Sequence, residues 1–317
     1  MIAKLTRLHL NTKTNSFFVQ KKLKKLIKLI KQSSVKILVY VLLIEFAFVF
    51  IFPYIYMIVN SIKSPLDFID ASSVYVVKYP TLKYYKELMD NTYFNYGNLL
   101  KYTIFSSVTS ALGQVISCSF AAYGLARFKF PGRKIIYVLI ILTLIIPPQI
   151  FLIPLFLQFS KIGLMDTFLP IIGPSFLAGG LKGSLFILIF IQSYLAMPKE
   201  LEESARIDGC GAVGTFWKII FPNIKPAILV TAILSIVWHW NDYFEPTVYF
   251  RNPNKYFLAS GFTWLSKNGG QFYMTGNNEL VNPIAMAAAV LVLLPLIVMY
   301  LIMQKRFMES VEHTGMK

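Results

Sequence analysis

Cysteine, histidine and acidic residues are all scarce in this chain of 317 residues. It has two cysteines and three histidines, and its 15 acidic residues are outnumbered by 31 basic ones. Cys118 and Cys210 alone provide neither a disulfide framework nor the ligand spacing of a metal site. The histidines lie in three separate regions, and no paired carboxylates or Ser-His-acid arrangement stands out. We therefore expect no metal site and no enzymatic activity in this chain.

A Gly-Lys dipeptide is also missing from the whole sequence. The phosphate-binding loop of P-loop ATPases needs this pair, because the lysine and the neighbouring backbone N–H groups hold the nucleotide phosphates. The chain is therefore expected to carry no nucleotide and no other cofactor of its own. Any step that ATP drives would be performed by a partner.

Apolar residues are abundant by contrast, at 56% of the chain, while charged residues make up only 15%. This composition is typical of polytopic membrane proteins. A membrane helix needs about 20 mostly apolar residues, and six stretches are long enough. They lie near 37–60, 97–126, 135–158, 174–197, 227–250 and 282–303. The predicted fold is all-α, a polytopic membrane protein with six transmembrane helices.

The distribution of basic residues predicts the orientation, because short cytoplasmic segments accumulate lysine and arginine. Residues 1–36 carry ten basic residues and no acid, and the loop at 127–134 carries four basic residues and no acid. Both segments are expected in the cytoplasm. Six spans then return the tail at 304–317 to the same side, together with the polar segment 198–226. The domain division is a basic cytoplasmic segment 1–36, a transmembrane domain 37–303 and a cytoplasmic tail 304–317.

The net charge of +16 does not indicate nucleic-acid binding, because most basic residues lie beside membrane spans. Orientation and contact with anionic membrane lipid account for them. Residues 18–33 place apolar side chains along one helix face and lysines elsewhere. This pattern fits either a helix in the headgroup region or a solvated basic tail.

The polar segment 198–226 has the signals of two short helices joined by a bend. Pro198 suits the first turn of a helix, and the acidic residues that follow complement the positive end of the helix dipole. Gly209 can adopt the left-handed backbone that ends many helices. A second short helix is expected from Thr215 to Phe221, stopped by Pro222. The segment is either a docking element for a cytosolic partner or an ordinary helical connection.

Residues in this segment resemble the "EAA" cytoplasmic loop of the membrane subunits of bacterial ABC importers. Family members usually have alanine where this chain has Ser204 and leucine where it has Phe221. The small and apolar characters of those positions are kept. The resemblance rests on Glu203, Ser204, Ala205, Asp208, Gly209, Ile219 and Pro222. It implies that Glu203, Ser204, Ala205, Asp208, Gly209 and Pro222 couple the subunit to its ATPase.

Further segments narrow the resemblance to the second permease subunit of sugar-type ABC importers, the maltose-transporter class. The similarity covers most of the region from Asn98 to Pro246. The segments are AAYGLARFKFPGRK from Ala121, the pairs Ile146-Pro147 and Ile153-Pro154, GLMDTFLPII from Gly163, and MPKELEESARIDG from Met197.

The resemblance implies a permease subunit in a multi-pass arrangement in a bacterial plasma membrane, with both termini in the cytoplasm. Its implied partners are a second permease subunit, two cytosolic ATPase subunits that bind ATP and Mg, and an extracytoplasmic sugar-binding protein. With the second permease, this chain would form the translocation pathway for a sugar or oligosaccharide. Segment 198–226 would be its coupling loop.

Candidate pathway residues follow in the segment 238–246. Trp238, Asn241 or Asp242, and Glu245 recur at three-to-four-residue spacing and would share one helix face. Aromatic rings with nearby amides and carboxylates can hold sugars, but the same residues near a membrane surface can form an interfacial belt. Gln149 follows Pro147-Pro148, which either frees a backbone carbonyl for the pathway or only kinks the helix.

Three other functions are compatible with parts of the sequence. An ion-coupled secondary transporter would use Glu45, Asp242 or Glu245 to carry a proton. A membrane scaffold would use segment 198–226 to recruit a cytosolic protein. An ABC permease for an amino acid, peptide or ion would keep the coupling loop and change the cargo. The docking segment and the lack of an evident internal repeat argue against the first, and the sugar-type segments argue against the last.

Overall fold

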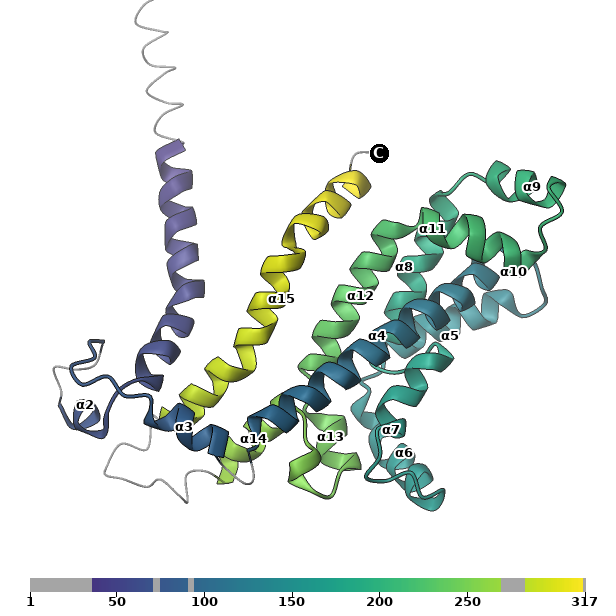
Figure 1. Cartoon of the computed structure of the whole chain (residues 1–317). Coiled ribbons are helices and arrows are strands. Elements are labelled where there is room, and N and C mark those ends of the chain that lie inside the picture. The colour runs from purple at the N-terminus through teal and green to yellow at the C-terminus, as the bar shows by residue number, and fades with distance from the viewer. Residues whose placement is uncertain (1–35, 71–74, 91–93, 269–282, 316–317) are drawn as a thin grey trace, which may run out of the picture. The chain divides into compact units, whose positions relative to one another are not determined.

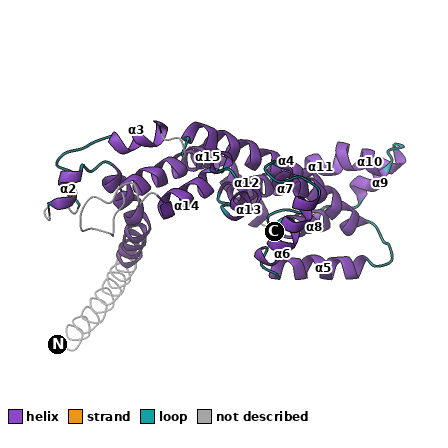
Figure 2. Cartoon of the chain, turned by 90° about the horizontal axis from the view of Figure 1, so that it is seen from below, coloured by secondary structure: helices purple, strands orange, loops and turns teal. Residues whose placement is uncertain are grey.

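The computed structural model describes residues 36–70, 75–90, 94–268 and 283–315. Over these ranges the regular elements are all helices, as Figure 2 illustrates, and the only strand-like pairing is an isolated bridge between Lys63 and Pro80. The predicted all-α fold is confirmed. The segment 1–35, including the lysine-rich stretch at 18–33, lies outside the described residues. The chain divides into two units, Met1–Ile58 and Val59–Lys317.

The first unit contains most of the helix Lys36–Ser61, which has 26 residues and a mean hydropathy of 2.4. Apolar side chains occupy all sides of this helix, as in a membrane span. The helix agrees with the stretch predicted at 37–60 and is long enough to cross a bilayer core of about 30 Å.

The second unit is organised around α4 (Tyr96–Arg127), a 32-residue helix that agrees with the stretch predicted at 97–126. The side chain of Asn95 begins it by accepting a hydrogen bond from Asn98 N–H at 3.1 Å. Helix α4 packs against α8 (Gly183–Ala196) and α12 (Lys225–Trp240). Small polar residues on α4, among them Ser106, Ser107 and Ser110, are fully buried there. Small residues allow membrane helices to approach closely.

Three of the predicted spans are interrupted. The stretch at 135–158 is two helices, α5 (Arg133–Ile145) and α6 (Gln149–Lys161), which meet at 102° around Pro147-Pro148. The stretch at 174–197 begins with η2 (Gly173–Leu177), so α8 starts only at Gly183. The stretch at 227–250 ends as α12 at Trp240, and α13 (Phe244–Tyr249) follows. By length and hydropathy, the described residues hold three helices long and apolar enough to span, and up to six if each bent pair counts as one. The bent pairs are α5 with α6, α8 with the helix Glu200–Ile207 at 78°, and the segment Ala212–Asn223 with α12 at 80°.

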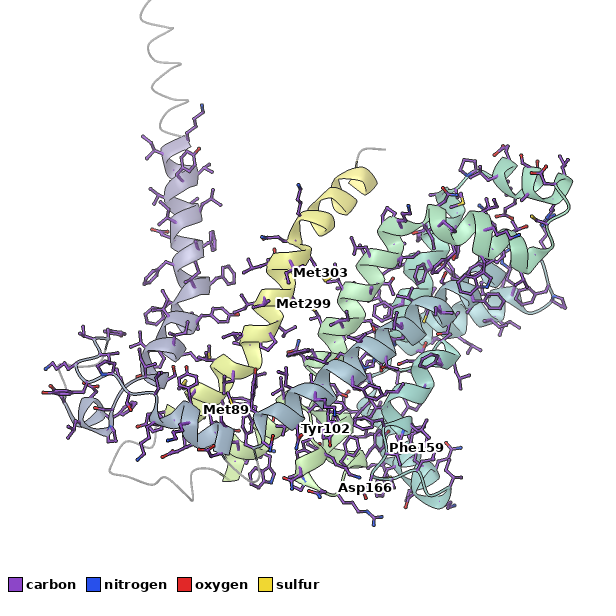
Figure 3. The ribbon with its side chains drawn as sticks, viewed as in Figure 1. Met89, Tyr102, Phe159, Asp166, Met299 and Met303 are labelled. Atoms are coloured by element: carbon purple, nitrogen blue, oxygen red, sulfur yellow. The ribbon has the colours of Figure 1, made fainter. Side chains whose placement is uncertain are left out.

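The two ends of α4 differ in what surrounds them. The helices of the polar loop, α9 (Glu200–Ile207), α10 (Ala212–Thr215) and α11 (Phe221–Asn223), lie at its Arg127 end, which we call the loop end (Figure 1). At its Tyr96 end, called the far end, lie α3 (Lys83–Asp90), α13 and α14 (Leu258–Asn268). Helix α15 (Pro283–Gly315) carries Met299 and Met303 (Figure 3) and continues through residues predicted as a tail.

Asp166 ties together two loops at the far end, where Figure 3 also places Tyr102 of α4 and Phe159 of α6. Its N–H donates to the carbonyl of Tyr249 at 2.9 Å, and its Oδ1 accepts from Arg251 N–H at 2.8 Å. An adjacent short helix, α7 (Leu169–Ile172), places Ile171 in a cluster with the aromatic rings of the 249–257 segment. The far end is thus held by polar contacts outside and aromatic packing inside.

Asp67 organises the segment that follows the first membrane helix. It lies in α2 (Pro65–Ile69), where its side chain and that of N-cap Ser64 form a capping box. Its carboxylate also accepts from Lys78 N–H at 3.1 Å and Tyr79 N–H at 3.2 Å. Burial opposes the charge of Asp67, but these backbone N–H donors outweigh it and together hold its pKa below the usual value.

Candidate functional site

The polar loop begins with α9, whose first turn contains Glu200, Glu202 and Glu203. Its C-terminus is closed by Gly209, which has φ +79°. Gly209 N–H donates to the carbonyl of Arg206 at 3.0 Å, and Cys210 N–H donates to that of Ala205 at 2.9 Å. This pair of bonds around a left-handed residue is the Schellman motif. The expectation that Gly209 ends the helix is confirmed.

The second arm of the loop is longer than predicted. It begins at Ala212 as α10, widens into the π-helical turn η3 (Phe216–Ile220) and ends as α11 at Asn223. The expected stop at Pro222 is therefore wrong. A proline breaks a helix by removing one N–H and by clashing with the preceding turn. In the first turn of α11, directly after a π-helical turn, the proline is tolerated, and the chain bends by 80° before α12.

An ion pair anchors the first arm to the membrane helices. Arg127, the last residue of α4, has its Nε 2.6 Å from Oε1 of Glu202, and the two side chains are only 5% and 8% exposed. The two atoms are not aligned as a hydrogen bond. Arg127 Nη2 also donates to the carbonyl of Met197 at 2.8 Å, just after α8. Arg127 therefore joins α4, the end of α8 and α9 at one point.

Aromatic rings anchor the second arm. The ring of Tyr123 on α4 lies 5.3 Å from that of Phe216 in η3 and 5.7 Å from that of Tyr194 on α8. The hydroxyls of Tyr194 and Ser119 are 2.6 Å apart. Phe216 and Tyr194 are fully buried. Both arms of the loop therefore contact α4 directly, so a movement of either arm acts on this helix.

The outer surface of the loop is available to a partner. Ile207 is 86% exposed and Val213 is 59% exposed, which is unusual for large apolar side chains outside the membrane. Ala205 is buried against the subunit instead. The other residues predicted to couple the subunit to an ATPase are exposed, namely Glu203, Ser204, Asp208, Gly209 and Pro222.

The structure separates the residues predicted to share one pathway face. Trp238 belongs to α12, whereas Glu245 belongs to α13, because the helix ends at Trp240. Asp242 is buried, and its Oδ1 accepts from Phe244 N–H at 3.0 Å and Glu245 N–H at 3.2 Å. Asp242 thus caps α13, and the expectation of one continuous face is wrong. Asn241 is exposed beside it.

A cavity of about 340 Å³ lies between α5, α6 and the start of α8. Pro148 and Phe151 line it, as does Lys182, whose ammonium is 4.7 Å from the ring centroid of Trp238. Gln149, the first residue of α6, is exposed and is not among the lining residues. The structure therefore brings Trp238 near this cavity, by way of Lys182, and leaves Gln149 outside it.

Gln114 is a central residue that the sequence analysis missed. Its Nε2 donates to the carbonyls of Gly179 and Leu181, both at 2.9 Å, and its Oε1 accepts from Ser235 Oγ at 2.6 Å. One side chain on α4 thus holds the irregular backbone before α8 and a residue of α12. A glutamine in an apolar stretch was the only available signal. Arg127 and Glu202 were likewise interpreted separately, as an orientation signal and a helix-dipole partner.

Comparison with a solved structure defines the class of protein. The fold is similar to a chain of a bacterial ABC transporter involved in the import of the acidic polysaccharide alginate, with a TM-score of 0.70 and 25% sequence identity over 86% of this chain and 95% of that chain. A family model described as the inner membrane component of binding-protein-dependent transport systems matches residues 114–313. The chain belongs to this family of multi-pass membrane transport proteins, which is not a known enzyme family.

Two of the similar proteins are permeases of sugar transport systems. A permease protein of the arabinooligosaccharide transport system of Halalkalibacterium halodurans is 29% identical over 215 residues, which are 68% of this chain and 72% of that protein. A probable permease for starch degradation products from Thermoanaerobacterium thermosulfurigenes is 28% identical over 268 residues, covering 84% and 92% of the two chains. The expected resemblance to ABC importer permeases is confirmed.

Proposed function

We propose that this chain is one of two permease subunits of an ATP-driven importer for a sugar or oligosaccharide. The observation that carries the proposal is the loop end, where a folded polar loop presents exposed apolar and acidic residues and is fixed to α4 by a buried ion pair. The carbohydrate cargo is supported by relatives named for arabinooligosaccharides and for starch degradation products.

The proposed assembly contains a second permease, two cytosolic ATPase subunits and an extracytoplasmic sugar-binding protein. ATP and Mg bind in the ATPase subunits, because this chain has no Gly-Lys dipeptide. The basic segments 1–36 and 127–134 support a cytoplasmic location for both termini and for the loop end. The loop surface around Ile207 then faces the ATPase.

In this mechanism, closure of the ATPase pair displaces the polar loop, and the subunit responds because the loop contacts differ between its inward-facing and outward-facing states. Arg127 and Glu202 carry the displacement from α9 to α4, since both are buried and neither has room to move independently. The Tyr123–Phe216 contact carries it from the second arm. Glu203, Asp208 and Gly209 lie on the exposed side that meets the ATPase.

Trp238 and Asn241 are the residues proposed to line the translocation pathway, and both are exposed at the end of α12. Trp238 offers a ring face for packing against a sugar, and Asn241 offers an amide. Asp242 has a supporting role, because it caps α13 and sets the direction of the chain past these two residues. Glu245 and Gln149 remain candidates for contact with cargo.

Co-purification tests the docking surface. The chain is expressed with its partner permease and ATPase subunits, and the yield of ATPase in the purified complex is measured for the parent and for Ile207→Asp. We expect the variant to lose most of the ATPase, because a charge replaces an apolar contact. Leu82→Asp is the matched control, since Leu82 is 70% exposed but lies just before α3, at the far end and outside the polar loop. Equal ATPase recovery for Ile207→Asp and the parent would contradict the docking role.

A further inference from the structure

Lys182 is a positive charge within the expected membrane region. It immediately precedes α8, whose 14 residues run from Gly183 to Ala196 at the loop end. At about 1.5 Å per residue, Lys182 lies roughly 20 Å from that end, inside a hydrocarbon core about 30 Å thick. A charged side chain at this depth is costly and generally serves a function.

The charge has an aromatic neighbour but no acidic one. Lys182 Nζ lies over the ring of Trp238, 4.7 Å from its centroid. None of the four ion pairs formed by the described residues includes Lys182. A cation–π contact orients an ammonium group and leaves its N–H donors available for an anion.

The backbone around Lys182 is held in a strained conformation. Ala178 and Lys182 have φ values of +57° and +61°, although neither is glycine. Such conformations are unfavourable for residues with a side chain and are found where the surrounding structure holds a functional site in shape. Gln114 supplies that restraint through its bonds to the carbonyls of Gly179 and Leu181.

The space beside Lys182 can admit a ligand group. The cavity of about 340 Å³ is mostly apolar, and its polar side chains are those of Lys182, Thr143 and Ser184. Of the residues that the structure describes, Lys182 is the only charged one that lines the cavity. Thr143 Oγ1 donates to the carbonyl of Ile140 at 2.8 Å, so an anionic group entering from this side would meet one cation, the Ser184 hydroxyl and a nearby indole ring.

We propose that Lys182 binds a carboxylate of the cargo and that the importer carries acidic oligosaccharides, those containing uronic acid units. The inference rests on the proposed function of the chain as a sugar permease. A neutral sugar leaves the ammonium without a counter-charge in a low-dielectric region, whereas a uronate neutralises it while its ring packs on Trp238. The alternative is that a carboxylate of the partner permease supplies the counter-charge for the Lys182 ammonium.

The test is transport by the complete complex with its binding protein in proteoliposomes. Uptake of short oligogalacturonides is compared with uptake of their carboxyl-reduced, neutral counterparts. We expect the parent to carry the acidic sugars, and Lys182→Met to lower their rate by about tenfold, as loss of one hydrogen-bonded charge pair predicts. Lys182→Arg retains transport because it keeps the charge. Lys161→Met, which removes an exposed lysine at the end of α6, is the matched control and leaves transport unchanged.

Three results would overturn the inference. In the first, the parent complex carries the neutral sugars but not the acidic ones. In the second, Lys182→Met carries the acidic sugars at the parental rate. In the third, Lys182→Met no longer co-purifies with the partner permease while Lys182→Arg does, which assigns the counter-charge to that subunit. Each differs from failure of the proposed function, in which no sugar of either kind is transported by the parent. The comparison of sugars in the parent needs no variant to fold.

Discussion

Arg127 and Glu202 form a buried ion pair between the last residue of α4 and the first turn of α9, with Nε and Oε1 2.6 Å apart. The pair sits where the polar loop meets the membrane helices. This contact therefore joins the first arm of the loop directly to α4. The account of coupling depends on it.

Breaking this pair from one side is predicted to destabilise the subunit. Glu202→Gln keeps the size of the side chain but leaves the Arg127 charge buried without a counter-charge, at a cost of about 3–5 kcal/mol. We expect a lower midpoint of thermal unfolding and weaker stimulation of ATP hydrolysis in the purified complex. The double variant Arg127→Met with Glu202→Leu should recover stability but not coupling. Full coupling in the double variant would rule out transmission through the pair.

Replacing Gly209 is predicted to weaken coupling without preventing assembly. Nothing lies within 4 Å of the position that an added Cβ would occupy, so the Cβ of Gly209→Leu meets no neighbouring atom. Its φ of +79° costs a side-chain residue about 1–2 kcal/mol. The end of α9 is therefore expected to shift. ATP hydrolysis stimulated by loaded binding protein should fall while the yield of complex is maintained.

Two controls accompany Gly209→Leu. Gly209→Asn should retain more activity, since asparagine tolerates left-handed backbone. Gly214→Ala should be neutral, because Gly214 has an ordinary φ and open space around its Cβ position. Parental stimulation in Gly209→Leu would show that the Schellman turn is not needed for coupling.

Asp67 is predicted to make the segment after the first helix sensitive to acid. Its pKa is lower in the folded chain than the usual value, so its charge stabilises the fold above about pH 4 and this contribution is lost as the pH falls through the folded pKa. Asp67→Asn removes the titrating group. The difference in unfolding midpoint between parent and variant should be largest at neutral pH and shrink below about pH 4. A difference that stays constant with pH would contradict this role.

Asp242 is predicted to act through structure and not through contact with cargo. Asp242→Asn keeps an oxygen that can accept from Phe244 and Glu245 N–H, so uptake should remain near the parental rate. Asp242→Ala should cost about 1 kcal/mol of stability, as for other helix caps. Trp238→Ala, which leaves the cap intact, should reduce uptake more than Asp242→Asn. Loss of transport in Asp242→Asn with normal stability would restore a pathway role for this carboxylate.

Sequence reasoning located the long helices because apolar length alone determines them, as for Lys36–Ser61 and α4. It also predicted the turn at Gly209, since that backbone conformation selects glycine. It failed at 238–245, where it predicted one continuous helix face. Asp242 accepts hydrogen bonds from two backbone N–H groups there, and a new helix begins after it. It missed the Arg127–Glu202 and Gln114 contacts because tertiary packing, and no local pattern, brings those residues together.

The most direct test of the account is ATP hydrolysis by this chain in complex with its partner permease and ATPase subunits, in lipid nanodiscs. Hydrolysis is measured with binding protein that is empty or loaded from a panel of neutral and acidic oligosaccharides. We predict stimulation by at least one loaded form and little by the empty one. Failure of any ATPase to co-purify, combined with proton-dependent uptake by this chain alone, would contradict the importer account.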